Sequence, residues 1–419
     1  MLKPFFLFDV CASAEFARRR GLATLIIGFV VAVNGDTIRG HADEPTPESE
    51  PTATTSSDVE RVVFRSGEEG YPVYRIPALV RAANGDLLAF CEARQKGDAS
   101  EIDLVLKRSS DDGETWSALR VVQESDDFRH LFGSDPPPIT IGNPAPVVDL
   151  MDPDHPGRIW LPFTVENHFV FVAWSDDHGA TWAKPRQLTD EVKLESWGWY
   201  ATGPGHSIQI QSGPHRGRLV IPADHRLGGN GEDRGPNGAQ VILSDDHGRR
   251  WRLGAIDATY DDGLNANETT VAELGDGTLY FNTRDQHGSA PGTRGGSWSI
   301  DGGDTFATRT DEWTAFQPTG SDLTLPVVQA SVIRFQGRLL LSGPDEDGPS
   351  GKGRSDLRVR VSGDQGLTWQ DGPLLHVGPA AYSDMVALND THVGILFEAG
   401  SPKQKSPYQS IRFERFQPN

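Results

Sequence analysis

The chain has 419 residues, with 59 acidic and 39 basic side chains, and its formal net charge is −20. This acidic excess argues against nucleic acid or an anionic membrane surface as a partner, because both would be repelled. Glycine is abundant, with 46 residues, and the periodicity of a helical bundle is missing, which favours short strands joined by turns.

The N-terminal region has the composition of an export segment. Arg18, Arg19 and Arg20 precede an apolar run from Gly21 to Val33 that is short for a membrane span and typical of a signal sequence. We therefore predict a signal peptide or an N-terminal anchor over residues 1–42. Residues 43–59 are acidic, rich in Pro, Ser and Thr and poor in strand formers, which predicts a disordered linker. The protein is then expected to be secreted, periplasmic or tethered to the cell surface.

A glycine turn followed by a short apolar strand recurs roughly every 60 residues, and fixed periods of this length indicate stacked or radial repeats. The six copies are GDLLAF from Gly85, GRIWLPF from Gly157, GRLVIPA from Gly217, GTLYFN from Gly277, GRLLLSG from Gly337 and HVGILFE around Gly394.

A second pattern, S-x-D-x-G-x-T-W, follows each of the first five copies. It begins at Ser109, Ser175, Ser244, Ser299 and Ser362. Serine and aspartate side chains can fold back onto backbone N–H groups, and glycine supplies a positive φ, so we interpret the pattern as a structural turn. Calcium needs six to eight oxygen ligands, more than these turns offer, and no metal or other cofactor is expected. The two repeats predict an all-β fold, a six-bladed β-propeller of four-stranded antiparallel blades over residues 60–419.

The motif YRIPAL, from Tyr74 to Leu79, makes a specific family resemblance visible. YRIP followed by these repeated turns, known as Asp boxes, resembles the exo-α-sialidase (neuraminidase) family over roughly residues 70 to 400. That family holds the carboxylate of sialic acid with three arginines and attacks with a tyrosine. The resemblance implies a retaining exo-α-sialidase that hydrolyses terminal sialic acids through a tyrosyl-sialosyl intermediate. The implied partners are sialylated glycoproteins, glycolipids or oligosaccharides, and a membrane only if the N-terminal segment is retained.

The resemblance assigns roles to positions that match in order and surroundings. It implies that Arg75, Arg284 and Arg354 bind the carboxylate, that Tyr382 is the nucleophile and that Glu268 is its base. A guanidinium group can bind a carboxylate with two hydrogen bonds, and three of them would fix its orientation. A neutral tyrosine avoids the repulsion that a carboxylate nucleophile would meet from the substrate.

The resemblance also implies roles for four further residues. By the same resemblance, Asp98 is the acid and base of the glycosidic oxygen, with a pKa raised by partial burial. Arg94 and Asn143 would contact the sugar near O4, although many related sequences have Asp-Pro where this chain has Asn143-Pro144. Glu398 would hold Arg75 by a paired hydrogen bond.

Two other functions stay open from sequence. A trans-sialidase would use the same residues to transfer sialic acid to a sugar, and a catalytically silent propeller would only bind glycans. Trp197 and Trp199, in the segment ESWGWYATGPGH, are candidates either for the wall of the aglycone site or for blade packing. His206 and His225 follow predicted blade strands and are candidates for lining the cleft.

Overall fold

The computed structural model describes residues 61–229, 235–260, 263–287, 294–307, 315–319, 323, 325–346, 353–403 and 405–418. Contacts divide the chain into two units, Met1–Ser56 and Ser57–Asn419. The predicted signal or anchor and the predicted linker lie outside the described residues. Within the described ranges, none of the helices has the length and apolar character that crossing a bilayer requires.

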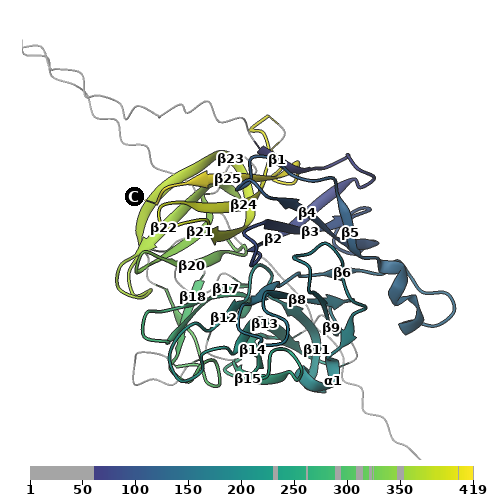
Figure 1. The fold of residues 1–419 in the computed structure, drawn as a ribbon, viewed down its shortest axis with the longest axis horizontal. Helices are drawn as coiled ribbons and strands as arrows, with labels where there is room; N and C mark the ends of the chain where they lie inside the picture. Colours follow the sequence, from purple (N-terminus) through teal and green to yellow (C-terminus); the bar gives the residue numbers. More distant parts are fainter. Residues whose placement is uncertain are drawn as a thin grey trace, which may run out of the picture. The chain divides into compact units, whose positions relative to one another are not determined.

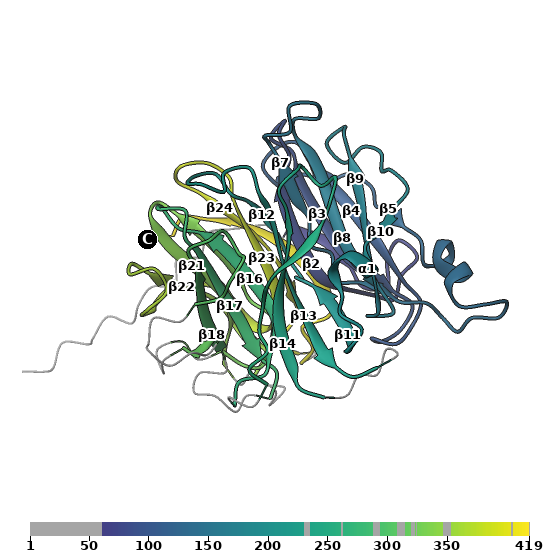
Figure 2. The same cartoon turned by 90° about the horizontal axis from the view of Figure 1, so that it is seen from below.

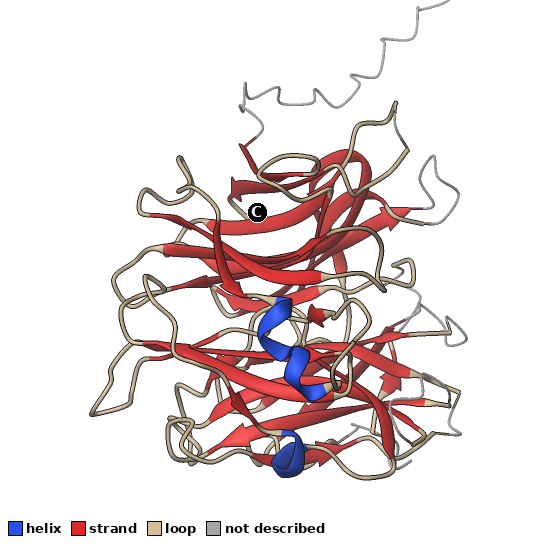
Figure 3. Ribbon diagram, turned by 90° about the vertical axis from the view of Figure 1, so that its right-hand side faces the viewer, coloured by secondary structure: helices blue, strands red, loops and turns tan. Residues whose placement is uncertain are grey.

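The described residues are almost entirely strands and loops, and helical turns are confined to η1 (Ser125–Leu131) and α1 (Thr189–Val192) (Figure 3). Hydrogen bonding groups the described strands into five antiparallel sheets. The first two sheets contain β2 (Val73–Arg81), β3 (Leu87–Arg94), β4 (Ile102–Ser109) and β5 (Arg120–Gln123), and then β6 (Ile141–Gly142), β7 (Val147–Asp149), β8 (Arg158–Val165), β9 (Phe169–Ser175) and β10 (Arg186–Gln187).

The next two sheets follow in chain order. They contain β11 (Trp197–Thr202), β12 (Ile208–Gln209), β13 (Leu219–Leu227), β14 (Asn237–Ser244) and β15 (Arg252–Ile256), and then β16 (Ala266–Glu273), β17 (Leu279–Asp285), β18 (Arg294–Ser299) and β19 (Gln317–Pro318). The last sheet has seven strands, β20 (Ser331–Phe335), β21 (Arg338–Glu346), β22 (Ser355–Ser362), β23 (Gln370–Ala387), β24 (Val393–Ala399), β25 (Ser410–Phe416) and β1 (Arg61–Arg65).

Six strands close a ring, one from each of the first four sheets and two, β20 and β23, from the seven-stranded sheet. Contacts run from β2 to β7, β7 to β12, β12 to β16, β16 to β20, β20 to β23 and β23 back to β2. Figure 1 looks onto this ring of sheets, and Figure 2 shows the strands from the side, running between two rims. The predicted all-β, propeller-like fold is confirmed.

The prediction of six separate four-stranded sheets is wrong, because hydrogen bonds join the described strands into five sheets, one of which has seven strands. Strand β23 spans 18 residues, and its first part pairs with β22 while its second part pairs with β24. Because one continuous strand serves both groups, they merge into the seven-stranded sheet. Strand β1 joins this sheet by pairing with β25, so that residues from both ends of the described propeller lie in one sheet.

The hydrophobic core lies between neighbouring sheets. Phe90 on β3 belongs to one buried cluster with Phe163 on β8, and Trp160 on β8 belongs to another with Ile221 on β13. Alternate residues of a strand point to opposite faces, so each sheet buries one set of side chains against each neighbour. The short apolar strands that follow the glycine turns in the sequence are therefore buried on both faces and are the units of this core.

The S-x-D-x-G-x-T-W turns form the same hydrogen bonds in every copy that keeps threonine. In the second copy, the Gly179 amide donates to Ser175 Oγ at 2.8 Å, and the Thr181 amide and hydroxyl donate to the Asp177 carboxylate at 2.7 and 2.6 Å. The equivalent threonine bonds recur at Asp111, Asp301 and Asp364. The prediction of a structural turn is confirmed.

The glycine of the turn also packs against the preceding sheet. Gly248 has φ of 76°, and a Cβ atom there would lie 2.3 Å from the Trp160 ring. A Cβ atom on Gly366, with φ of 91°, would lie 2.5 Å from the Tyr280 ring. Each turn therefore fixes one sheet on the next, and a larger residue would separate them.

The Asp177 turn predicts a pH-dependent contribution to stability. Burial raises the pKa of Asp177, but hydrogen bonds from Thr181 and Ser175 outweigh burial and lower it to about 2. A free aspartate has a pKa of about 3.9. Because the folded pKa is the lower one, the contribution is present above about pH 4 and is lost as pH falls towards 2. We expect Asp177→Asn to be less stable than the parent in urea unfolding at pH 7.

The difference between Asp177→Asn and the parent should shrink as the pH is lowered from 5 to 3. The exposed Asp190 lies outside the turn, and Asp190→Asn should match the parent at every pH. A stability difference for Asp177→Asn that stays constant over this range would contradict the assignment.

Candidate active site

Three of the strands that close the ring, here called the inner strands, have irregular pairing at the points where predicted site residues lie. The pairing register shifts between Arg75 and Ala78 on β2, between Ala266 and Thr269 on β16, and between Ala380 and Ser383 on β23. Such bulges change the direction in which a side chain points and are common beside active sites. They give Arg75, Glu268 and Tyr382 access to one shared space.

That space is a cavity of about 490 Å³ that brings together eight of the nine predicted site residues. These are Arg75, Arg94, Asp98, Asn143, Glu268, Arg284, Arg354 and Tyr382. Glu398 does not line the cavity, since it is fully buried behind Arg75. The residues come from sequence positions hundreds apart and meet only because the inner strands form a ring.

Tyr382 and Glu268 form the centre of the cavity. The Tyr382 hydroxyl donates a hydrogen bond to Glu268 Oε1, and Arg284 Nη1 donates to Glu268 Oε2 at 2.7 Å. The same arginine nitrogen lies 3.2 Å from the tyrosine oxygen. Burial and the Glu268 carboxylate raise the pKa of Tyr382, and the nearby arginines do not reverse this. The tyrosine is therefore a neutral phenol whose proton points at a carboxylate.

Arg75 is fixed from behind by Glu398. Its Nε donates to Glu398 Oε1 at 2.6 Å, and the same oxygen accepts the Ile76 amide at 2.9 Å. The other oxygen accepts the Tyr382 amide at 3.2 Å. The predicted paired hydrogen bond to Arg75 is thus wrong in form, because the second oxygen binds the neighbouring strand. Ile76 has φ of 59°, a strained value for a β-branched residue, and the bond from its amide helps to hold it.

Burial alone would lower the pKa of Arg75, but the Glu398 carboxylate and the rings of Tyr408 and Tyr382 raise it overall. The guanidinium carbon lies 3.9 Å from the centre of the Tyr408 ring. Arg354 is held from the same side, since its Nη1 donates to Tyr408 Oη at 2.6 Å. Tyr408 therefore contacts two of the three arginines, Arg75 through its ring and Arg354 through its hydroxyl group.

Arg94 and Asp98 form an ion pair at the cavity wall. Arg94 also donates to the buried Glu92 carboxylate, with Nε at 2.8 Å. The Asp98 side chain is 87% exposed, and Arg75 Nη1 lies 3.9 Å from its Oδ1. Burial raises the pKa of Asp98, but the charge and hydrogen bond of Arg94, and then Arg75 and Arg354, lower it overall. The expected rise in the pKa of Asp98 is therefore wrong, because the arginines outweigh the partial burial of its carboxyl group.

Asn143 is positioned by its backbone. Its φ is 59°, and its amide donates to Glu92 Oε1 at 2.8 Å, while its side-chain nitrogen donates to Thr164 Oγ1 at 3.1 Å. A Cβ atom on Gly142 would lie 2.6 Å from the same Glu92 oxygen. Glu92 therefore anchors both Arg94 and Asn143, as Glu398 anchors Arg75.

Sequence reasoning missed Glu92 and Tyr408. Glu92 had a signal, since it lies two residues before Arg94 on the same strand and so on the same face. Tyr408 lies in a loop before β25, where no sequence pattern marks it. Trp199 lines the cavity, whereas Trp197 is buried and stacks on the fully buried His225 at 3.8 Å between ring centres.

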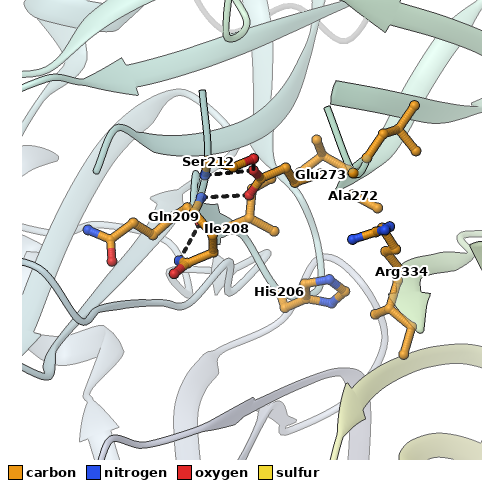
Figure 4. Close-up of a pocket in the computed structure, with 12 residues that line it drawn as sticks. His206, Ile208, Gln209, Ser212, Ala272, Glu273 and Arg334 are labelled. Atoms are coloured by element: carbon orange, nitrogen blue, oxygen red, sulfur yellow. Dashed lines mark hydrogen bonds between the residues drawn. The ribbon is translucent and has the colours of Figure 1, made fainter. Parts of the chain in front are cut away.

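A second cavity of about 410 Å³ contains His206, together with Glu273 and Arg334 (Figure 4). It lies at the other end of β16, which carries Glu268 near its start and Glu273 at its end. The Glu273 carboxylate is occupied by the backbone and hydroxyl of Ser212, at 2.9 and 2.5 Å. Among the described residues that line this second cavity there is no tyrosine, and His206, a candidate for lining the active-site cleft, lies here instead.

Comparison with known proteins defines the class to which this cavity and fold belong. The BNR repeat-like domain family matches residues 85–395, and the chain belongs to that family. A sialidase of Micromonospora viridifaciens is 29% identical over 92% of this chain, and a sialidase of Bacteroides fragilis is 27% identical over 80%. The chain spans 58% and 62% of these two relatives' lengths.

The solved structures agree with these relatives. The Hadza microbial sialidase Hz136 is 28% identical, with a TM-score of 0.68, and the match covers 85% of this chain and 68% of that one. The chain is thus a propeller-like member of the BNR repeat-like family whose relatives across most of its length are sialidases.

The anchoring of Arg75 predicts a large effect of Glu398 on stability. Glu398→Ala leaves the Arg75 guanidinium, whose side chain is only 9% exposed, without its carboxylate. Breaking such a buried pair costs about 3–5 kcal/mol. We expect urea unfolding to show a loss in that range.

The matched control is Glu114→Ala, which removes an exposed partner of Arg61 at 2.5 Å. Exposed pairs contribute about 1 kcal/mol or less. Equal losses of stability in the two variants would show that Glu398 has no anchoring role.

Proposed function

We propose that the chain is a retaining exo-α-sialidase, a glycoside hydrolase that removes terminal sialic acids from glycoconjugates through a tyrosyl-sialosyl intermediate. One observation carries the proposal. Three guanidinium groups, those of Arg75, Arg284 and Arg354, line the same cavity as a tyrosine whose hydroxyl donates to a carboxylate. The sialidase relatives support the same substrate class.

The arginines suit a ligand with a carboxylate on its reacting carbon. In a chain with a net charge of −20, an anion needs a local cluster of cations to bind. Arg75 and Arg354 are each held by other groups of the protein, so they need little further ordering to bind. A carboxylate held by three guanidinium groups would place the anomeric carbon in one fixed position.

Tyr382 would then attack the anomeric carbon. As its oxygen forms the new bond, its proton passes along the existing hydrogen bond to Glu268. Since the pKa of Tyr382 is raised, a free phenolate is a minor species, and transfer of the proton during attack avoids forming it. Arg284 touches both groups and would stabilise the charge that moves between them.

Asp98 would protonate the leaving oxygen and later deprotonate the attacking water. Arg94, Arg75 and Arg354 together lower the pKa of Asp98. A bound substrate carboxylate would neutralise Arg75 and Arg354 and cover the exposed carboxyl group, and both changes raise the pKa of Asp98. Arg94 and Asn143 would contact the sugar near O4.

The number of blades and the export of the chain are part of the same proposal. We count two blades in the seven-stranded sheet, with β23 shared between them, which gives six blades in all; the ring of contacts between inner strands supports this count. The basic and apolar residues before Val33 support export of the enzyme to the cell exterior or periplasm, where sialylated glycoconjugates would be its substrates.

Removal of the nucleophile tests the mechanism. We expect Tyr382→Phe to lose at least ~100-fold of kcat/KM on an aryl α-sialoside, because the substitution removes the oxygen that would form the covalent bond. Release of the fluorescent phenol gives the rate. Tyr71→Phe is the matched control, since it removes a phenol that donates to Asp103 and does not line the cavity, and it should lose far less.

A covalent adduct distinguishes the proposed mechanism from binding alone. A sialosyl fluoride with a second fluorine at C3 should add one sugar mass to the parent enzyme and none to Tyr382→Phe. A parent that binds sialosides but neither turns over nor forms the adduct would instead be a glycan-binding propeller. Transfer of sialic acid to lactose in place of water would identify a trans-sialidase.

The role of Asp98 predicts a dependence on the leaving group. Asp98→Asn should lose ~100-fold or more on sialyllactose, whose sugar oxygen needs a proton to leave. The loss should be much smaller on a nitrophenyl sialoside, because nitrophenolate leaves without protonation. Equal losses of kcat/KM on both substrates would show that Asp98 is not the general acid.

A further inference from the structure

Two neighbouring sheets bring a histidine and two aspartates together away from the active-site cavity. Asp149 ends β7, Asp152 follows it in the loop to β8, and His247 lies in the Asp-box turn between β14 and β15. One ligand atom from each of the three lies within 4.8 Å of the others. None of them lines the active-site cavity.

The two aspartates are buried, with exposures of 0% and 1%. Asp149 is well satisfied, since its Oδ1 accepts the Asp152 amide and Gln209 Nε2, and its Oδ2 accepts from His247 Nδ1 at 2.9 Å. Asp152 is different. Burial raises the pKa of its carboxyl group, but the backbone amides of Asp154 and His155 both lower it. Its Oδ1 accepts the Asp154 amide, whereas the buried Oδ2 has no hydrogen-bond partner among the described residues.

A buried carboxylate oxygen almost always has a partner, and the Asp152 carboxylate that carries this oxygen stands in one cluster with a histidine nitrogen and a second carboxylate. Because carboxylates accept and do not donate, the partner that suits such a cluster is a cation or a hydrogen-bond donor. We propose that Asp149, Asp152 and His247 form a site for a divalent zinc-type cation.

The chemistry of the three side chains selects the metal. Calcium and magnesium prefer sites made of oxygen, whereas an imidazole nitrogen with two carboxylates suits zinc and its neighbours in the first transition row. Zinc binds such atoms at about 2.0–2.2 Å, so two tetrahedral ligands lie about 3.3 Å apart. The His247 nitrogen and the Asp149 oxygen, at 2.9 Å, need to separate by only a few tenths of an ångström. Water would complete the coordination.

Arg249 is the charge that opposes a cation here. Its Nη2 lies 3.6 Å from Asp152 Oδ1 and 2.7 Å from Asp154 Oδ2, and its side chain is 48% exposed. It thus already pairs more closely with the exposed Asp154 than with Asp152. A metal would replace its weak contact with Asp152 and leave the Asp154 pair intact.

The bound metal would join two sheets of the ring. Asp149 and Asp152 belong to the sheet that contains β8, and His247 to the sheet that contains β14. A cation that binds only the folded arrangement stabilises it in proportion to its occupancy. This function is structural, does not depend on the proposed sialidase activity and is measured without a substrate.

The test is a titration of the full chain, stripped with chelator and free of a histidine tag, with zinc chloride in a calorimeter. We expect one site with a dissociation constant of about 10 μM or below, and a rise in Tm with zinc. Asp152→Asn, which keeps the size of the side chain, and His247→Ala should each weaken binding at least ~10-fold.

The control is His178→Ala. His178 occupies the corresponding position in the preceding Asp box, with φ of 58° against 61° for His247, but has no part in the cluster. Its substitution should leave zinc binding unchanged. Failure of the parent to bind zinc at 100 μM overturns the proposal. Binding that is equal in the parent, Asp152→Asn and His247→Ala, each shown to be folded by circular dichroism, also overturns it.

Discussion

The buried Glu398 carboxylate is the interaction on which both the ring and the cavity depend. It comes from β24 and binds Arg75 and the Ile76 amide of β2 as well as the Tyr382 amide of β23. These strands belong to the first and last sheets in chain order, so one side chain ties the closure of the ring to the position of the central tyrosine. The strained backbone of Ile76 is tolerated because this bond and the surrounding strands hold it.

Glu92 repeats the same arrangement on the other side of the cavity. One of its oxygens holds Arg94 and the other holds the Asn143 amide. In both cases a buried carboxylate compensates the charge of an arginine and satisfies a backbone amide of an adjoining element. The guanidinium groups of Arg75 and Arg94 can therefore lie close together in the cavity of a strongly acidic chain, and each is held in one orientation. Glu268 differs, because its partners are the tyrosine and arginine that face the cavity themselves.

The Asp box shows how one local element serves several purposes. Its serine, aspartate and threonine close the turn by hydrogen bonds, and its glycine lets the turn approach the neighbouring sheet. The position between the aspartate that binds threonine and the glycine has a positive φ in every copy, but its side chain differs from copy to copy, being Asp112, His178, His247, Gly302 and Gln365. In the third copy this position holds His247, which reaches a buried aspartate of the preceding sheet. A repeated structural turn thus provides a place where a new contact between sheets can arise.

The repeating strands, the turns between them and the residues that the sialidase resemblance marks could all be predicted from the sequence. They depend on local features, namely short apolar runs, the φ of glycine and the hydrogen bonds of short polar side chains, so they are visible in a single chain. The shared strand β23, the place of Tyr408 between two arginines and the lowering of the Asp98 pKa by Arg94 appear only once the chain is folded. The sequence predicted no metal because the Asp-box turns offer too few oxygens, and the approach of His247 to Asp149 is likewise visible only in the folded chain. Each of these features depends on contacts between segments that are far apart in the sequence. Neither the repeat period nor the composition shows which of these segments meet in the folded chain.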